Sequence, residues 1–168
     1  LKKFENIFNF LKKNSVMLSM NLIKEDLKKL GISHDNFTSE TDIVEKKFLN
    51  QIIKILKKRK IVINDYLEPP KGGEKLDWKK IKRLVFKSTL YGDDADRALQ
   101  KNDGSWTYFA NDLAYHYYKI KRYNSNLINI LGADHTGYVK RITSAVKAIS
   151  NGKVMLNCKV CQLVKLFK

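Results

Sequence analysis

The last part of the chain, residues 127–168, decides the fold: LINILGADHTGYVKRITSAVKAISNGKVMLNCKVCQLVKLFK. It opens with a run that is apolar except for Asn129 and ends in Gly132, which is typical of a buried parallel strand. Residues 136–150 have the apolar spacing of a helix, and residues 154–167 again favour a strand. With a further helix predicted over residues 112–123, the order helix, strand, helix, strand indicates an α/β fold with a doubly wound parallel sheet.

The first part of the chain is predicted to be helical. Apolar residues recur at helical spacing over residues 2–30, and Gly31 is well placed to stop this helix. Thr41 or Asp42 can cap a second helix, which is predicted to run to about Lys58.

The middle of the chain has short elements and frequent turns. The apolar runs at residues 61–63 and 84–86 predict strands. The proline- and glycine-rich segment 68–73 predicts an exposed loop, and the Asp103-Gly104 step predicts a hairpin. We therefore expect a small inserted α/β segment in this region.

The sequence is strongly basic, with a formal net charge of +16 and a pI of about 9.8. Such a balance fits a polyanionic partner such as tRNA or DNA. Yet 28 of the 33 basic residues are Lys, whereas nucleic-acid readers favour the Arg fork for specific contacts. Compositional drift towards Lys, Ile and Asn explains the charge equally well, so both interpretations stay open.

Two cysteines, Cys158 and Cys161, form a lone Cys-x-x-Cys pair. A structural zinc site needs a second pair or suitably spaced histidines, so we predict no metal site and two buried apolar thiols. Nothing indicates disulfides, and no apolar run approaches the ~20 residues that span a bilayer. We therefore expect a cytoplasmic protein without membrane association.

The turn after the apolar run is the first candidate site. Gly132 would let a ligand approach the backbone closely. Asp134 could accept hydrogen bonds from a ribose, and His135 could donate to a carboxylate or phosphate near a helix N-terminus. The alternative is a plain strand-to-helix turn in which Asp134 is only an N-cap.

Tyr108 and Asp112 form a second candidate site near the start of a predicted helix. The helix dipole should keep a carboxylate there ionised, and an ionised carboxylate matches the donor fork of a guanidinium. Glu40 could add a second negative charge for a cationic substrate. The alternatives are a capping Asp, a core Tyr and a solvated Glu. We find no nucleophile or phosphate-binding loop, so the catalytic residues are unknown and any catalysis would depend on positioning and electrostatics.

Several segments match the sequence patterns of one protein family. Residues 86–97, FKSTLYGDDADR, resemble the pattern F-R-S-T-x-F-G-D-D-x-D-R of the arginyl-tRNA synthetases of the bacterial type. Residues 101–116, KNDGSWTYFANDLAYH, look like K-S-D-G-S-Y-T-Y-F-A-P-D-I-A-Y-H, and residues 132–139, GADHTGYV, match G-A-D-H-H-G-Y-V. Further segments fall in the family's order, at residues 26–40, 69–72 and 161–164.

The resemblance implies a class I Rossmann-type catalytic domain. Residues 1–60 would be a helical segment that joins the first Rossmann half to an insertion. Residues 61–110 would be that insertion, with short strands and a hairpin, and residues 111–168 the second half of the catalytic domain. The chain would thus be an internal fragment of the catalytic domain.

The family's reaction joins arginine to ATP, giving arginyl-adenylate and pyrophosphate, and then moves arginine to the terminal ribose of its tRNA. The resemblance therefore implies tRNA(Arg), L-arginine and ATP as partners. Mg2+ would accompany ATP, no tightly bound cofactor is expected, and the full-length enzyme would be a monomer.

The resemblance also assigns site residues. The arginine site would consist of Glu40, Tyr108, Asp112 and His135, with Asp112 meeting the guanidinium. The nucleotide site would consist of Gly132, Asp134 and Gln162.

Some positions depart from the family pattern. Asn111 stands where the family usually has Pro, Thr136 where it often has His, and Lys87 where it usually has Arg. The family's H-I-G-H-like and K-M-S-K-S-like motifs, which hold ATP phosphates in the transition state, do not occur in these 168 residues. We therefore expect no aminoacylation by this chain alone.

Two other functions remain as alternatives. One is a basic module that binds nucleic acid without catalysis. The other is a different class I synthetase, such as one for cysteine, although Tyr108 with Asp112 favours a cationic side chain and no zinc ligand set is present.

Overall fold

The computed structural model describes residues 2–45, 47–67 and 81–165. The chain divides into two compact units, Leu1–Thr38 and Ser39–Lys168. The loop predicted at residues 68–73 lies outside the described residues.

In the first unit, α1 (Lys2–Lys29) confirms the predicted helix. It ends as expected at Gly31, whose φ of 73° is a left-handed conformation that glycine adopts without strain. The amide of Ile32 donates to the carbonyl of Leu27 at 2.9 Å and closes the last turn. The large apolar side chains of α1, such as Phe8 and Leu18, are exposed, so they form no core within this unit.

In the second unit, Lys47 divides the predicted second helix into α2 (Glu40–Glu45) and α3 (Phe48–Lys58). The prediction of one helix to Lys58 was therefore wrong. α3 buries one stripe of side chains at helical spacing, namely Leu49, Ile52, Ile53 and Leu56. In an unbroken helix Ile43, six residues before Leu49, would point away from this stripe. The left-handed Lys47 (φ 56°) redirects the chain, and Ile43 is buried as well.

Three short strands form an antiparallel sheet in the order β1-β2-β3. β1 (Val62–Asp65) and β2 (Arg83–Phe86) confirm the two predicted strands, with Val62 opposite Phe86. β3 (Arg97–Ala98) pairs with β2, and the 3-10 helix η2 (Ser88–Tyr91) connects these two strands.

The predicted hairpin is present, and the next helix starts earlier than predicted. Gln100 pairs with Trp106 in an antiparallel bridge around Gly104, which has a φ of 82°. α4 (Tyr108–Tyr123) begins four residues before Asp112, because the hydroxyl of Thr107 accepts from the amide of Ala110 and caps the helix there.

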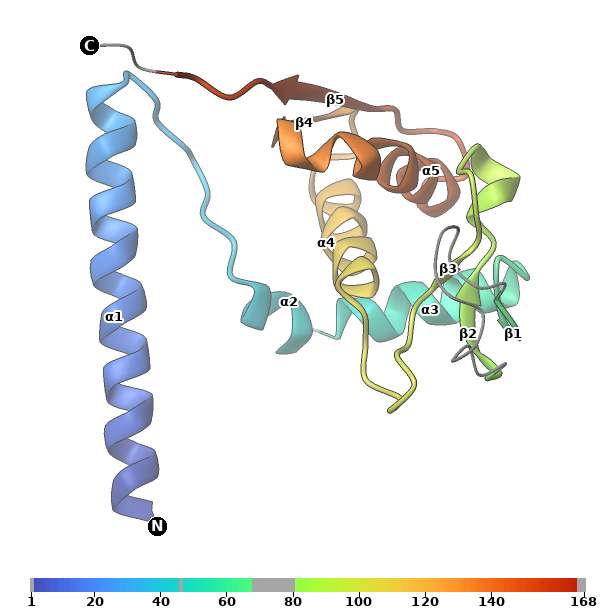
Figure 1. Ribbon diagram of the computed structural model, residues 1–168, viewed down its shortest axis with the longest axis horizontal. Helices are drawn as coiled ribbons and strands as arrows, with labels where there is room; N and C mark the ends of the chain where they lie inside the picture. The colour runs from blue at the N-terminus through green and yellow to red at the C-terminus, as the bar shows by residue number, and fades with distance from the viewer. Residues whose placement is uncertain (1, 46, 68–80, 166–168) are drawn as a thin grey trace. The chain divides into compact units, whose positions relative to one another are not determined.

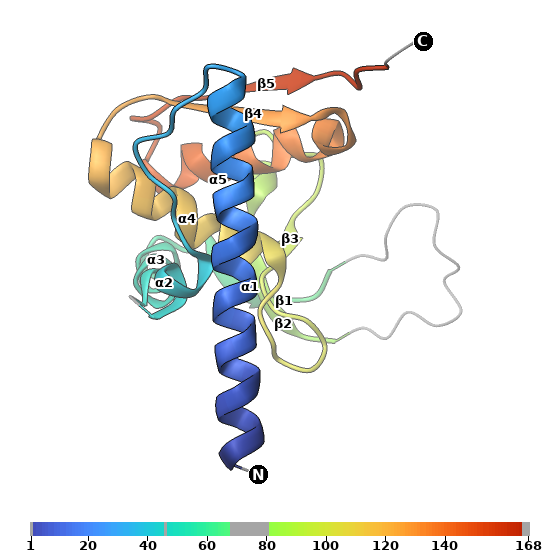
Figure 2. The same ribbon diagram turned by 90° about the vertical axis from the view of Figure 1, so that its left-hand side faces the viewer.

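β4 (Leu127–Gly132) and β5 (Leu156–Cys161) form a parallel pair, with Gly132 opposite Cys161. They are joined by η3 (Ala133–Tyr138) and α5 (Val139–Ile149), so the helix predicted from Thr136 begins as a 3-10 helix. Figures 1 and 2 show α4 and α5 on one side of this pair.

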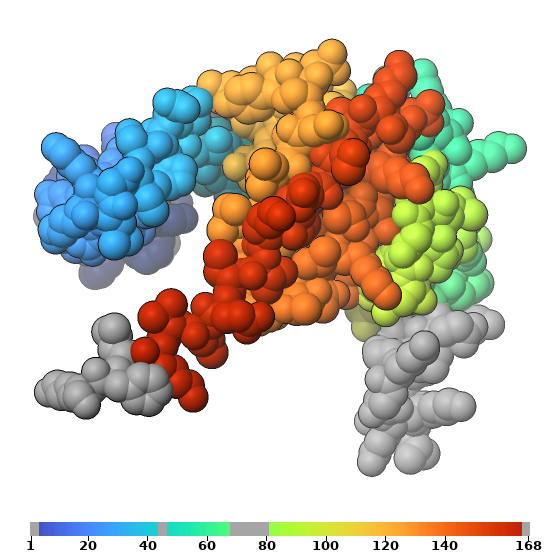
Figure 3. All heavy atoms as spheres, turned by 90° about the horizontal axis from the view of Figure 1, so that it is seen from above, coloured from blue at the N-terminus to red at the C-terminus, as the bar shows by residue number. Residues whose placement is uncertain are grey.

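The other side of the parallel pair is open in the described part of the chain. Ile128 and Ile130 are 67% and 66% exposed, so the prediction of a fully buried strand was wrong for this face. Figure 3 shows β5 lying on the surface of the second unit. The thiols differ accordingly: Cys158 is only half-buried and Cys161 is exposed, so the prediction of two buried thiols was wrong.

The core of the second unit lies between its helices and the two sheets. Its fully buried side chains include Ile52, Phe86, Leu99, Leu113 and Ile142. The α/β class is thus confirmed, whereas the doubly wound sheet and the three-part domain division stay predictions. Among the described helices, none combines the length and apolarity that a membrane span requires.

Candidate functional site

Asp112 lies on α4 and is half-buried. Its Oδ2 accepts a hydrogen bond from the hydroxyl of Tyr138. Burial raises the pKa of Asp112, the Tyr138 hydrogen bond opposes this rise, and the charge of Glu40 adds to it. The early start of α4 places Asp112 beyond the first turn, where the free amides and the helix dipole act, so they do not offset the effect of burial. That Asp112 is ionised stays a prediction.

Glu40 is the first residue of α2, and it lies close to α4. Its Oε1 accepts from Nδ2 of Asn111 at 2.8 Å. Glu40 and His135 are both near enough to Asp112 for their charges to affect its pKa, in opposite directions. The structure thus brings three of the four proposed arginine-site residues together, with two carboxylates that favour a cationic ligand.

Tyr108 is the fourth of these residues, and it points outward. It lies one turn before Asp112, at a spacing that puts both on one face of α4. Its side chain is 84% exposed, and Nζ of Lys101 lies 6.0 Å from its ring centroid. Tyr108 is therefore available to a ligand, but it is not packed with Asp112.

The glycine-led turn follows β4 as predicted. A Cβ atom on Gly132 would lie 2.5 Å from Oδ1 of Asp134, so only glycine leaves room for this carboxylate conformation. Nε2 of His135 lies 3.4 Å from Oδ2 of Asp134, and both side chains are exposed.

Gln162 lies at the same end of the parallel pair as this turn. It directly follows Cys161, whose partner in the sheet register is Gly132. Gln162 is exposed. The three proposed nucleotide-site residues therefore gather at the carboxyl ends of β4 and β5, where ligands of open α/β sheets bind.

Tyr138 is a site residue that the sequence interpretation missed. Its ring packs edge-on against that of Phe109, with 6.5 Å between the ring centroids. The guanidinium carbon of Arg141 lies 5.1 Å from the centroid of the Tyr138 ring. Burial and the hydrogen bond to Asp112 both raise the pKa of Tyr138, so it stays protonated and acts as a donor. Its position in the segment GADHTGYV, which matches the family pattern, could have indicated that Tyr138 belongs to the site.

A series of hydrogen bonds that includes the buried His116 connects α4 to β4. Nδ1 of His116 lies 2.8 Å from the carbonyl of Asp112, and Nε2 lies 3.1 Å from Nδ2 of Asn129. Oδ1 of Asn129 accepts from Nζ of Lys119 at 3.1 Å. Burial lowers the pKa of His116 to about 4, so its ring is neutral at physiological pH. These hydrogen bonds hold α4, the helix that carries Asp112, against β4.

The segment 86–97 forms a charged cluster that has a structural role. Arg97 donates two hydrogen bonds to the fully buried carboxylate of Asp93, from Nε to Oδ2 at 2.8 Å and from Nη2 to Oδ1 at 2.7 Å. Burial alone would raise the pKa of Asp93, but bonds from Arg97, the Asp94 amide and Ser88 outweigh it and hold the pKa well below its usual range.

Lys87 extends this cluster towards β1. Its Nζ lies 2.6 Å from Asp96 and 3.4 Å from Asp65. The segment therefore ties β1, η2 and β3 together, and Ser144 of α5 joins it through the carbonyl of Tyr91 at 3.3 Å.

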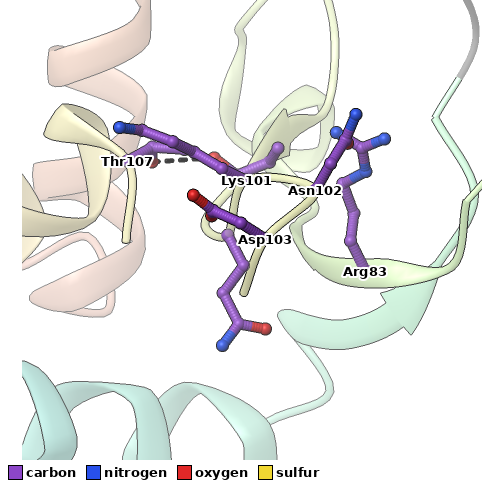
Figure 4. Close-up of a pocket in the computed structure, with 7 residues that line it drawn as sticks. Arg83, Lys101, Asn102, Asp103 and Thr107 are labelled. Carbon is purple, nitrogen blue, oxygen red and sulfur yellow. Dashed lines mark hydrogen bonds between the residues drawn. The ribbon is translucent and has the colours of Figure 1, made fainter. Parts of the chain in front are cut away.

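One hollow of about 430 Å3 lies between β2 and the hairpin. Figure 4 shows Arg83 and Asn102 on one side of it, and Lys101 and Thr107 on the other. None of the described residues that line it belongs to the predicted arginine or nucleotide site.

Comparison with known proteins gives a consistent result. No protein-family model matches the chain. It is 55% identical over 166 residues to an arginine–tRNA ligase of Pelagibacter ubique, which covers 99% of this chain and 29% of that protein. It is 52% identical over 145 residues to an arginine–tRNA ligase of Rhodospirillum rubrum, covering 86% of this chain and 24% of that one.

A solved structure agrees with these relatives. A crystal structure from Campylobacter jejuni, described as that of an arginyl-tRNA synthetase, matches 86% of this chain with a TM-score of 0.67 and 29% identity. This chain covers 28% of that structure, and it spans less than a third of the curated relatives cited above. The resemblance seen in the sequence is confirmed, as a resemblance to one segment of these proteins.

Proposed function

We propose that this chain, which is homologous to a part of arginine–tRNA ligases, is an internal segment of the catalytic domain of such an enzyme. The whole enzyme would use ATP to join L-arginine to tRNA(Arg). The observation that carries the proposal is the half-buried Asp112, held by Tyr138 and flanked by Glu40.

Asp112 is suited to bind the guanidinium of arginine. Tyr138 occupies one lone pair of Oδ2, which leaves Oδ1 and the second Oδ2 lone pair for a forked contact. Glu40 adds negative charge, and the exposed ring of Tyr108 can lie against the planar cation. His135 would meet another polar group of the bound arginine.

The nucleotide would lie at the carboxyl ends of β4 and β5. Gly132 gives close access to the backbone, Asp134 would accept from a ribose hydroxyl, and Gln162 would border the same ligand. The parallel pair would be part of a class I Rossmann-type sheet that other segments of the whole enzyme complete. ATP would bind there with Mg2+ as a substrate complex.

The remaining features of the proposal follow the family. Residues 1–60, 61–110 and 111–168 would be the linking segment, the insertion and the second catalytic half. The enzyme would work in the cytoplasm as a monomer. The 168 residues alone would bind arginine without forming arginyl-tRNA, because the sequence holds neither phosphate-binding motif of the family.

Calorimetric titration tests this proposal. We expect the chain to bind L-arginine and to bind L-citrulline at least tenfold more weakly, because citrulline has the same shape without the charge. Asp112→Asn should abolish this preference, whereas Asp103→Asn, a change in an exposed turn, should keep it. Equal affinity for arginine and citrulline would refute the arginine site.

A further inference from the structure

A second hollow lies away from the proposed arginine site, between α3, the antiparallel sheet and the hairpin. Its volume is about 730 Å3. Figure 1 shows α3 running beside β1 and β2. We call this hollow the α3 groove; its lining includes Lys54, Lys57, Lys58, Asn64, Gln100 and Trp106.

The charge of the α3 groove is uniformly positive. Lys54, Lys57 and Lys58 lie at i, i+3 and i+4, so they share one face of α3. None of them has an ion-pair partner among the described residues, and none of the described residues that line the groove is acidic. The helix dipole favours Lys57 and Lys58 in the last turn, but it does not account for Lys54. Like charges at this spacing repel, and a bound polyanion would relieve the repulsion.

The lining of the α3 groove also includes an aromatic ring and two amides, from β1 and the hairpin. Trp106 is half-buried against the core, and its bridge to Gln100 fixes its backbone. A ring held in this way is a platform on which a nucleic-acid base can stack. Gln100 and Asn64 each have a donor and an acceptor that could meet the edge of such a base.

We propose that the α3 groove binds a single-stranded segment of RNA, with phosphates along the lysine row and a base on Trp106. A row of cations beside an aromatic platform is the combination that single-stranded nucleic acid requires. An acidic peptide would use the lysines but not the ring, and a duplex would keep its bases stacked away from Trp106. The inference deepens the proposed function, because it gives the RNA substrate a contact surface outside the arginine site.

Fluorescence anisotropy with a labelled, unstructured oligouridine tests the lysine row. The triple variant Lys54→Gln, Lys57→Gln, Lys58→Gln should bind at least tenfold more weakly than the wild type. The slope of log affinity against log salt should fall by about two, since each lost phosphate contact removes about 0.7. The control is Lys147→Gln, Lys153→Gln, Lys159→Gln, which removes the same charge from exposed positions elsewhere in the second unit. Equal losses in both triple variants would overturn the proposal.

Substitutions of Trp106 test the stacking. Trp106→Tyr keeps an aromatic ring and should bind within about threefold of the wild type, whereas Trp106→Leu should bind about tenfold more weakly. An unchanged Trp106→Leu, or equal competition by polyglutamate or by duplex RNA, would also overturn the proposal. The arginine titration separates the two hypotheses: the lysine variant should keep its preference for arginine over citrulline, and Asp112→Asn should keep its affinity for oligouridine.

Discussion

The hydroxyl of Tyr138 donates a hydrogen bond to Oδ2 of Asp112 and thereby joins η3 to α4. Asp112 belongs to the proposed arginine site, and Tyr138 belongs to the segment that begins at Gly132 in the proposed nucleotide site. The two proposed sites therefore share a direct contact, which fixes the carboxylate that would read the guanidinium.

Replacing Tyr138 with Phe removes only this hydrogen bond. We expect a loss of about 1–3 kcal/mol in the free energy of unfolding, because a half-buried carboxylate loses a donor. We also expect the pKa of Asp112 to rise further, since the bond from Tyr138 lowers it. Arginine binding needs the ionised carboxylate, so the acidic limb of its pH profile should move to higher pH.

Calorimetry over a range of pH measures that shift. Tyr66→Phe is the matched control, because Tyr66 follows β1 and is 48% exposed, and it should leave the profile unchanged. A Tyr138→Phe variant that is destabilised but has the wild-type pH profile would show that Tyr138 supports the fold without positioning Asp112.

The sequence was sufficient to predict most helices and strands, and it proposed residues that the structure brings close together. Apolar spacing located the long helix before Gly31, and apolar runs located the two strands of the parallel pair. The resemblance supplied Glu40 and Asp112, which α2 and α4 then bring together from distant parts of the chain.

The failures have local physical causes. The left-handed conformation of Lys47 could not be predicted from the sequence, because lysine rarely adopts it. Only the burial of Ile43 in the folded chain requires it. The start of α4 was misplaced because the Thr107 cap was overlooked. Tyr138 was missed because its bond to Asp112 depends on the packing of η3 against α4, which periodicity does not describe.

The contact between Asp93 and Arg97 should make the fold sensitive to acid. The pKa of Asp93 is lowered in the folded state, so its contribution to stability is complete above the unfolded value of about 3.8 and is lost as pH falls through the folded value. Asp93→Asn should destabilise the fold by about 2–3 kcal/mol at neutral pH, because the charged acceptor of Arg97 disappears.

Chemical denaturation at several pH values tests this expectation. The neighbouring exposed Asp94→Asn should cost much less, because its carboxylate is 68% exposed. The loss caused by Asp93→Asn should shrink below about pH 4, because Asp93 of the unfolded wild type then binds a proton that the folded state does not. A cost that is the same at neutral and acidic pH would rule out the ionised Asp93 as the stabilising species.

We expect the buried His116 to cause a second acid-sensitive fall in the free energy of unfolding, at higher pH than that of Asp93. Burial lowers its pKa to about 4 from an unfolded value of 6.5, so the unfolded state binds more protons between these values. The free energy of unfolding should therefore fall as pH drops from about 6.5 to about 4, by up to about 3 kcal/mol. His116→Gln should flatten this part of the curve, while His34→Gln, in the first unit and exposed, should not. A wild-type curve that is flat over this range would contradict the neutral buried ring.

Gly132→Ala tests the proposed nucleotide site with little disturbance of the fold. Gly132 has a φ of −71° and a ψ of 162°, which alanine adopts readily, and its surroundings are exposed. The added Cβ would, however, lie 2.5 Å from Oδ1 of Asp134 and force this carboxylate to turn away. We expect an unchanged melting temperature together with at least tenfold weaker binding of ATP, measured by titration. Gly137→Ala is the matched control, because a Cβ there meets nothing within 4 Å and should leave ATP affinity unchanged. If Gly132→Ala bound ATP as the wild type does, Asp134 would be only a turn residue, and the nucleotide would have to contact the chain elsewhere.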